Sequence, residues 1–289
     1  MNDPLSAIFE TAAVERLATG FELTEGPLWD PDGGWFYFVD TRHARLYKIT
    51  PGKDPEVFRE NPSGVNGTTF DLEGRIIICE SPSRRVTRLH PNGQIEVIAE
   101  RYEGKRLNRP NDVVCASDGS IYFTDPARSD RFGERESPYS GVYRLSAAGE
   151  LELVADCEYP NGLAFSPDES ILYVANSRSV RYVQAIELDA RGTGARQRIF
   201  VDMSSGDEPP VPDGIKVDIE GRVFATGTGG VWVVEPDGTV LGIMRLPEPP
   251  ANLAFGGPDL KTLFLTARTS VYSVRVRTPG LAHPRFRSR

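Results

Sequence analysis

The chain has 289 residues, including 28 Gly and 23 Pro, and carries a net charge of −8. Its length suffices for one large domain or two, and an acidic chain without a basic patch argues against nucleic acid as a partner. No apolar run approaches the ~20 residues of a membrane-spanning helix, so we expect no membrane partner either. The N-terminus lacks a basic-then-apolar signal pattern, and the cysteines are odd in number, which favours unpaired thiols and a reducing, cytoplasmic location. These cysteines are Cys79, Cys115 and Cys157.

The first predicted strand, residues 14–23, precedes six segments that begin alike. Each segment starts a strand and is followed by a Gly- or Asp-rich turn and an apolar run, which is the signal of a β-hairpin. Their first residues lie 41, 45, 50, 52 and 38 positions apart. The segments are Glu25-Gly26-Pro27-Leu28-Trp29, Asn66-Gly67-Thr68-Thr69-Phe70, Asn111-Asp112-Val113-Val114-Cys115, Asn161-Gly162-Leu163-Ala164-Phe165, Asp213-Gly214-Ile215-Lys216-Val217 and Ala251-Asn252-Leu253-Ala254-Phe255.

Six repeats of short strands at this spacing are typical of a β-propeller. We therefore predict an all-β, six-bladed β-propeller with four-stranded antiparallel blades. The repeats run from residue 25 to about 277 without a linker, so residues 1–289 are interpreted as a single domain. The sixth repeat ends after its third strand, and residues 14–23 are expected to supply the fourth, which would remove the exposed edges of an open ring.

Two segments stand apart from the repeats. The loop at residues 125–140 is the longest between a second and a third strand and is rich in charge and aromatic residues. A long loop of this kind is typical of a lid or a substrate-binding element, with a mobile decoration as the alternative. The basic tail from His283 to Arg289 is predicted to be a disordered end.

The repeat starts also predict a cation site. A propeller brings equivalent positions to the same height on its axis, and five of the six starts carry an oxygen-bearing side chain: Glu25, Asn66, Asn111, Asn161 and Asp213. Two carboxylates neutralise a divalent ion, and amide oxygens complete an all-oxygen site that suits Ca²⁺, Mg²⁺ or Mn²⁺ better than Zn²⁺. The metal ligands are predicted to be Glu25, Asn111, Asn161 and Asp213, whereas Asn66 is expected to contact substrate or water. For any one of these residues alone, an ordinary turn role is the alternative.

Beyond the repeat starts, several motifs resemble the senescence marker protein/gluconolactonase/luciferin-regenerating enzyme family, which includes regucalcin-like proteins. They are Leu107-Asn108-Arg109-Pro110-Asn111-Asp112, Tyr122-Phe123-Thr124-Asp125-Pro126, Pro160-Asn161-Gly162 and Pro212-Asp213-Gly214, together with Glu25-Gly26-Pro27-Leu28-Trp29. The bacterial gluconolactonase branch is the most similar. The resemblance implies a six-bladed propeller that binds a metal through Glu25, Asn161 and Asp213. It also implies that Asn111 lies at or near the metal and touches substrate, and that Arg109 binds substrate oxygens.

The activity that this resemblance implies is metal-dependent hydrolysis of a small, sugar-derived or similar lactone by a metal-activated water. Asp213 would serve as ligand and general base, the cofactor would be a divalent cation, Ca²⁺ before Zn²⁺, Mg²⁺ or Mn²⁺, and the partner a small-molecule lactone. Two alternatives remain at this point. One is hydrolysis of other esters or phosphoesters at the same site, and the other is a non-enzymatic calcium-binding regulatory protein.

Overall fold

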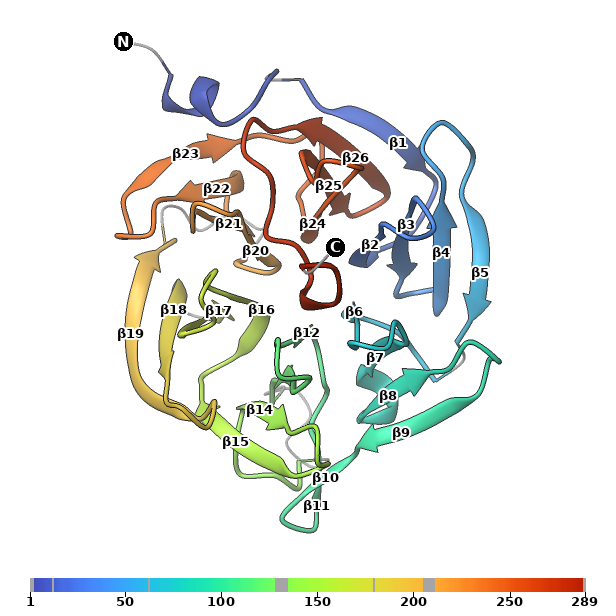
Figure 1. Ribbon diagram of the computed structural model, residues 1–289, viewed down its shortest axis with the longest axis vertical. Helices are drawn as coiled ribbons and strands as arrows, with labels where there is room; N and C mark the ends of the chain where they lie inside the picture. Colours follow the sequence, from blue (N-terminus) through green and yellow to red (C-terminus); the bar gives the residue numbers. More distant parts are fainter. Residues whose placement is uncertain are drawn as a thin grey trace.

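The computed structural model describes residues 3–11, 13–61, 63–127, 135–178, 180–204 and 211–287. Figure 1 shows the strands gathered into sheets that surround a central axis like the blades of a propeller. The predicted all-β, six-bladed β-propeller with four-stranded antiparallel blades is confirmed. Across the described ranges, no helix is both long and apolar enough to span a membrane.

The first three blades use consecutive strands, ordered from the axis outward. Blade one contains β2 (Thr24–Asp30), β3 (Trp35–Asp40), β4 (Arg45–Ile49) and β5 (Glu56–Glu60). Blade two contains β6 (Thr68–Phe70), β7 (Ile76–Glu80), β8 (Arg85–Leu89) and β9 (Ile95–Ala99). A small ribbon of β10 (Arg101–Tyr102) and β11 (Lys105–Arg106) leads to blade three, which contains β12 (Val113–Cys115), β13 (Ile121–Asp125), β14 (Gly141–Leu145) and β15 (Leu151–Asp156).

The remaining blades repeat this order, except that the last one borrows a strand. Blade four contains β16 (Pro160–Phe165), β17 (Ile171–Ser177), β18 (Arg181–Leu188) and β19 (Gly194–Asp202). Blade five contains β20 (Ile215–Val217), β21 (Val223–Gly227), β22 (Gly230–Val234) and β23 (Val240–Met244). Blade six contains β24 (Asn252–Gly256), β25 (Thr262–Ala267), β26 (Ser270–Arg275) and β1 (Glu15–Thr19). The described 3₁₀ helices are η1 (Pro4–Ala7), η2 (Ser81–Ser83) and η4 (Pro284–Phe286).

The N-terminal strand closes the ring, as predicted. Strand β1 pairs antiparallel with β26, with Glu15 opposite Ser273 and Thr19 opposite Ser270. It is shorter than the predicted 14–23, because the chain leaves the sheet at Gly20 and enters blade one at Thr24. There the Thr24 hydroxyl donates to the Ser270 carbonyl at 3.1 Å. The two ends of the propeller are therefore joined by backbone pairing and by a buried side-chain hydrogen bond.

Apolar side chains fill the spaces between neighbouring blades. Between blades six and one, the ring of Phe264 stacks on Phe36 at a centroid distance of 4.5 Å and on Trp29 at 5.4 Å. The second strands are the most deeply buried, since both of their faces meet another blade. Such aromatic contacts contribute beyond the area that they bury, and they fix the angle between blades and hence the position of each inner strand.

The inner strands touch one another at the axis through glycine. The Gly162 amide donates to the Asp213 carbonyl at 3.1 Å, and the Gly67 amide donates to the Asn111 carbonyl at 2.8 Å. A Cβ atom at Gly162 would lie 2.1 Å from the Asp213 carbonyl oxygen, so only glycine permits this approach. These bonds set the starts of successive repeats at a common level, which is the condition for a shared site.

The C-terminal tail is not a disordered end, so that prediction is wrong for residues 283–287. The Leu281 amide donates to the Val217 carbonyl at 2.9 Å, and His283 Nε2 bonds the Phe70 carbonyl at 3.0 Å. Arg287 pairs with Glu169 at 2.7 Å. Burial lowers the pKa of His283 to about 4, which keeps it neutral near pH 7. The tail therefore crosses the face where the inner strands end, opposite the repeat starts (Figure 1).

Candidate metal and substrate site

The predicted site residues lie at the same end of the inner strands. Glu25 belongs to β2 and Asn161 to β16, and both are buried. Asn66, Asn111 and Asp213 each precede an inner strand by two residues and are half-buried. The backbone bonds between neighbouring repeat starts bring these residues around one axis. The geometry thus supplies the shared height that the sequence argument required, while the ligand roles themselves stay predictions.

Glu25 is held in place from one side. Its Oε2 atom accepts a hydrogen bond from the Gly26 amide at 3.0 Å and another from Asn252 Nδ2 at 3.1 Å. Asn252 Nδ2 also donates to Asp112 Oδ2 at 3.4 Å. Within the described part of the chain, no hydrogen bond reaches the other carboxylate oxygen, Oε1. The carboxylate is therefore oriented by its neighbours and keeps one oxygen available to a ligand.

Asn161 contains a buried oxygen atom without a partner. Its Nδ2 atom donates to the Ser177 hydroxyl at 3.0 Å, and that hydroxyl in turn donates to the Pro212 carbonyl. Its Oδ1 atom is buried and has no hydrogen-bond partner among the residues that the structure covers. Buried polar atoms are nearly always satisfied, and an exception needs an explanation. A cation at the axis supplies one, because an amide oxygen is a suitable ligand for a hard divalent ion.

The electrostatics of the site also fit a cation. Burial raises the pKa of Glu25 to about 7, and the negative charge of Asp112 adds to this rise. Burial raises the pKa of Asp213 well above its usual range, the charges of Glu25 and Asp112 add to the effect, and a hydrogen bond from Asn161 opposes it. Carboxylates of like charge, buried together, are costly unless a proton or a cation compensates them.

Asp112 does not join Glu25 and Asp213 as a third carboxylate ligand. In the described ranges, no group of three or more His, Cys, Asp or Glu side chains could hold a metal ion. The predicted set instead combines two carboxylates with amide oxygens. The side chains of Asn66 and Asn111 make no hydrogen bond within those ranges. They are accordingly available for a metal ion, a water molecule or a substrate.

Arg109 lies on a loop that Asp125 fixes. The Asp125 carboxylate accepts from the Asn108 amide at 2.7 Å and from the Arg109 amide at 2.6 Å. Asn108 Nδ2 donates to the Tyr139 carbonyl at 2.7 Å. Burial raises the pKa of Asp125 to about 7, against the effect of these two amides. Arg109 is half-buried two residues before Asn111, so this clamp positions its backbone next to the site. Residues 128–134 of the 125–140 loop lie outside the described residues.

Sequence reasoning overlooked two residues beneath the ring, Asn252 and Lys216. The structure supports the start of the sixth repeat at Ala251, since the Gly214 amide donates to the Ala251 carbonyl at 2.9 Å, like the equivalent bonds at Asn111 and Asp213. The polar residue that matters there is the next one, Asn252. A sequence signal for Asn252 does exist. The residue directly after the repeat start is glycine in four repeats, but it is Asp112 and Asn252 in the other two.

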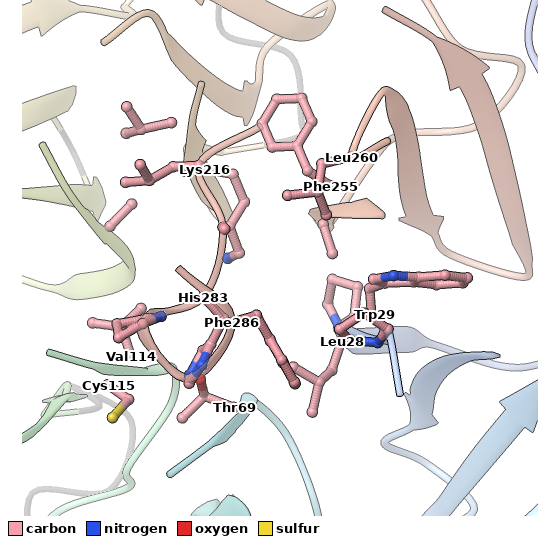
Figure 2. Close-up of a pocket in the computed structure, with 18 of the residues that line it drawn as sticks. Leu28, Trp29, Thr69, Val114, Cys115, Lys216, Phe255, Leu260, His283 and Phe286 are labelled. Carbon is pink, nitrogen blue, oxygen red and sulfur yellow. The ribbon is translucent and has the colours of Figure 1, made fainter. Parts of the chain in front are cut away.

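A cavity of about 440 Å³ lies at the far end of the axis, away from the predicted ligands. It is lined by the inner strands and the C-terminal tail, with His283 and Phe286 on the tail side. Figure 2 shows Lys216 reaching toward the middle of this space from its inner strand, among apolar side chains such as Leu28 and Phe255. The tail and these apolar residues thus line most of this cavity.

Comparisons with known proteins identify relatives of this chain. A profile of the SMP-30/Gluconolactonase/LRE-like region matches residues 23–269. The gluconolactonase of Zymomonas mobilis is 33% identical over 96% of this chain and 85% of its own. The solved structure of XC5397 from Xanthomonas campestris, described as a gluconolactonase, is 31% identical with a TM-score of 0.87, covering 96% of this chain and 93% of that one.

A more distant solved structure shares the fold. Regucalcin from Agrobacterium tumefaciens, described as a calcium-binding protein, superposes with a TM-score of 0.76 at 22% identity, covering 93% of this chain and 97% of that one. The profile match extends over all six repeat starts, from before Glu25 to beyond Ala251. The chain therefore belongs to the SMP-30/gluconolactonase/LRE-like family.

Proposed function

We propose that this protein is a lactonase that hydrolyses the ester bond of a small, sugar-derived lactone and depends on one divalent cation at the propeller axis. The observation that carries the proposal is the buried Oδ1 of Asn161, which has no partner among the described residues. It lies at the same end of the inner strands as the buried carboxylate of Glu25 and the half-buried carboxylate of Asp213. The two gluconolactonases, each more than 30% identical over nearly the whole chain, support the lactone substrate.

Glu25, Asn161 and Asp213 would hold the ion, with Asn111 at or near it. A carboxylate and amide set of this kind favours Ca²⁺, because Ca²⁺ accepts oxygen ligands in flexible geometry. When bound, the cation would supply a Lewis acid that polarises the lactone carbonyl and lowers the pKa of water. In this proposal water is the nucleophile, and the predicted carboxylates, amides and guanidinium bind and orient the reactants.

The side chains have separate tasks in this proposal. Asp213 accepts the proton of the attacking water. Asn161 donates a hydrogen bond to the Asp213 carboxylate, which lowers the pKa of Asp213. Asn111 and Asn66 have polar side chains available at the rim. Arg109, whose backbone Asp125 fixes, donates to hydroxyl or carboxylate oxygens of the substrate. These roles can be tested by a pH-release assay on a panel of aldonolactones and aliphatic lactones, in which the proposal expects turnover of the aldonolactones.

Replacing Arg109 by Ala should distinguish substrate binding from metal binding. We expect kcat/KM for a hydroxylated lactone to fall by about one to two orders of magnitude, because charge-assisted hydrogen bonds to the substrate are lost. A lactone without ring hydroxyls should lose much less, and Ca²⁺ affinity should barely change. Arg101→Ala, which removes an exposed guanidinium from the neighbouring ribbon, is the matched control. Equal losses for both lactones would show that Arg109 has only a structural role.

Stabilisation by Ca²⁺ should increase with pH. The pKa of Glu25 in the metal-free fold is raised from 4.5 to about 7 by burial. For a carboxyl with a raised pKa, the stabilisation is complete below pH 4.5 and is lost as the pH rises through 7. The metal-free protein should thus weaken over this window, whereas bound Ca²⁺ replaces the proton. Thermal unfolding at pH 5, 6, 7 and 8 should show a growing gap between the two forms, and a constant gap would contradict the assignment of Glu25.

A further inference from the structure

Two layers of residues below the ligand ring each contain exceptions to an otherwise uniform pattern. In the first layer, directly after the repeat starts, four positions are glycine and the other two are Asp112 and Asn252. In the second layer, three residues after each start, five side chains are uncharged and the sixth is Lys216. The second-layer residues are Leu28, Thr69, Val114, Ala164, Lys216 and Ala254.

Asn252 contacts the ring through hydrogen bonds, whereas Lys216 acts on it through its charge. Asn252 bridges two carboxylates, since its Nδ2 atom donates to Glu25 and to Asp112. Lys216 donates from Nζ to the Ile215 carbonyl at 2.9 Å. Its positive charge opposes the rise that burial causes in the pKa of Asp112 and, to a smaller extent, that of Glu25. Hydrogen bonds of Asn252 therefore link Asp112 to the predicted ligand Glu25, and Lys216 lies within electrostatic range of both carboxylates.

The formal charges of this set are informative. Glu25, Asp112 and Asp213 contribute three negative charges, and Lys216 contributes one positive charge. We propose that Lys216 is a fixed counter-charge for Asp112 that holds the net charge of the axial site at two negative charges, matched to a divalent ion, while Asn252 positions Glu25. This inference rests on the cation site proposed above. Asp112 and Lys216 are positioning residues in it, because neither would touch the ion or the substrate.

A burial argument supports this role for Lys216. A lysine at the base of an apolar cavity is costly, because removing an ammonium from water is compensated only by nearby negative charge. Leucine, valine or alanine occupies the equivalent second-layer position in four other repeats, so packing alone does not require a lysine. The residue that its charge serves best is Asp112, which is buried and is not one of the predicted ligands.

The preference between a trivalent and a divalent ion measures this net charge directly. The experiment determines the Kd of Ca²⁺ and of Tb³⁺ by calorimetry for the wild type, Lys216→Met, Asp112→Asn and the double variant. Both ions bind the same metal-free protein, so changes in its folding or protonation cancel in the ratio of the two constants. Lys53→Met, at an exposed turn, is the matched control, and Lys216→Gln is a second neutral variant should Lys216→Met fold poorly.

Lys216→Met should shift the preference toward Tb³⁺ by roughly tenfold, the size expected for one unit charge about 10 Å from the ion at an effective dielectric constant of about 20. Asp112→Asn should shift it by a similar factor toward Ca²⁺. The double variant should return to within about threefold of the wild type, since its two changes cancel in charge. If the wild type binds neither ion, the cation site itself is overturned. If it binds both and the ratio is the same in all variants, only the counter-charge role is overturned.

Discussion

Asp213→Asn is expected to reduce lactone turnover by about two to four orders of magnitude, even with the cation site saturated, because that is the usual contribution of a general base. The substitution keeps an oxygen that could bind a cation but removes the basic carboxylate and one negative charge. Metal affinity should therefore weaken as well, so the assay must be run at several Ca²⁺ concentrations to separate the two effects.

The control for this substitution is Asp237→Asn in the same blade. Asp237 occupies an exposed turn where it accepts a hydrogen bond from the Thr239 amide at 2.8 Å, a bond that asparagine can also accept. Its replacement should leave turnover unchanged. If metal-saturated Asp213→Asn hydrolysed lactones at nearly the wild-type rate, Asp213 would not be the base, and another group would have to accept the proton of the attacking water.

Removal of the metal is expected to have the second large effect. After treatment with a chelator, hydrolysis of an aldonolactone should fall by about two orders of magnitude or more, because the Lewis acid is lost and no protein group replaces it. Ca²⁺ should restore both the activity and the thermal stability. The stability is restored because the like charges of Glu25, Asp112 and Asp213 are again compensated. Full activity in a protein shown by elemental analysis to be free of metal would contradict the proposed mechanism.

The fold could be predicted from the sequence because its periodic features are local. Each repeat contains its own turn signals, and the position of the N-terminal strand followed from a missing fourth strand. The alignment of the repeats, including Ala251, also placed five polar side chains at one end of the axis. What the alignment could not supply was the contact between repeats, such as the bond from Asn252 to Glu25, which joins residues 227 positions apart.

The C-terminal tail shows the same limit of sequence-based prediction. Its composition, Pro-Arg-Phe-Arg-Ser-Arg, is typical of a disordered end, yet Arg287 and His283 find partners in blades four and two. Those partners come close to the tail only in the closed ring, so no local sequence pattern predicts the contacts. Lys216 was overlooked for a related reason, because the role that we propose for this lysine depends on buried carboxylates from other repeats.

The most direct test of the cation site is a calorimetric titration of the metal-free protein with Ca²⁺ at pH 8, repeated for Glu25→Gln and Asn161→Ala. We predict one binding site per chain in the wild type and a loss of affinity in each variant of at least tenfold, about the effect of removing one charged or well-placed oxygen ligand. Absence of binding in the wild type, or equal binding in all three proteins, would contradict a cation site at the propeller axis.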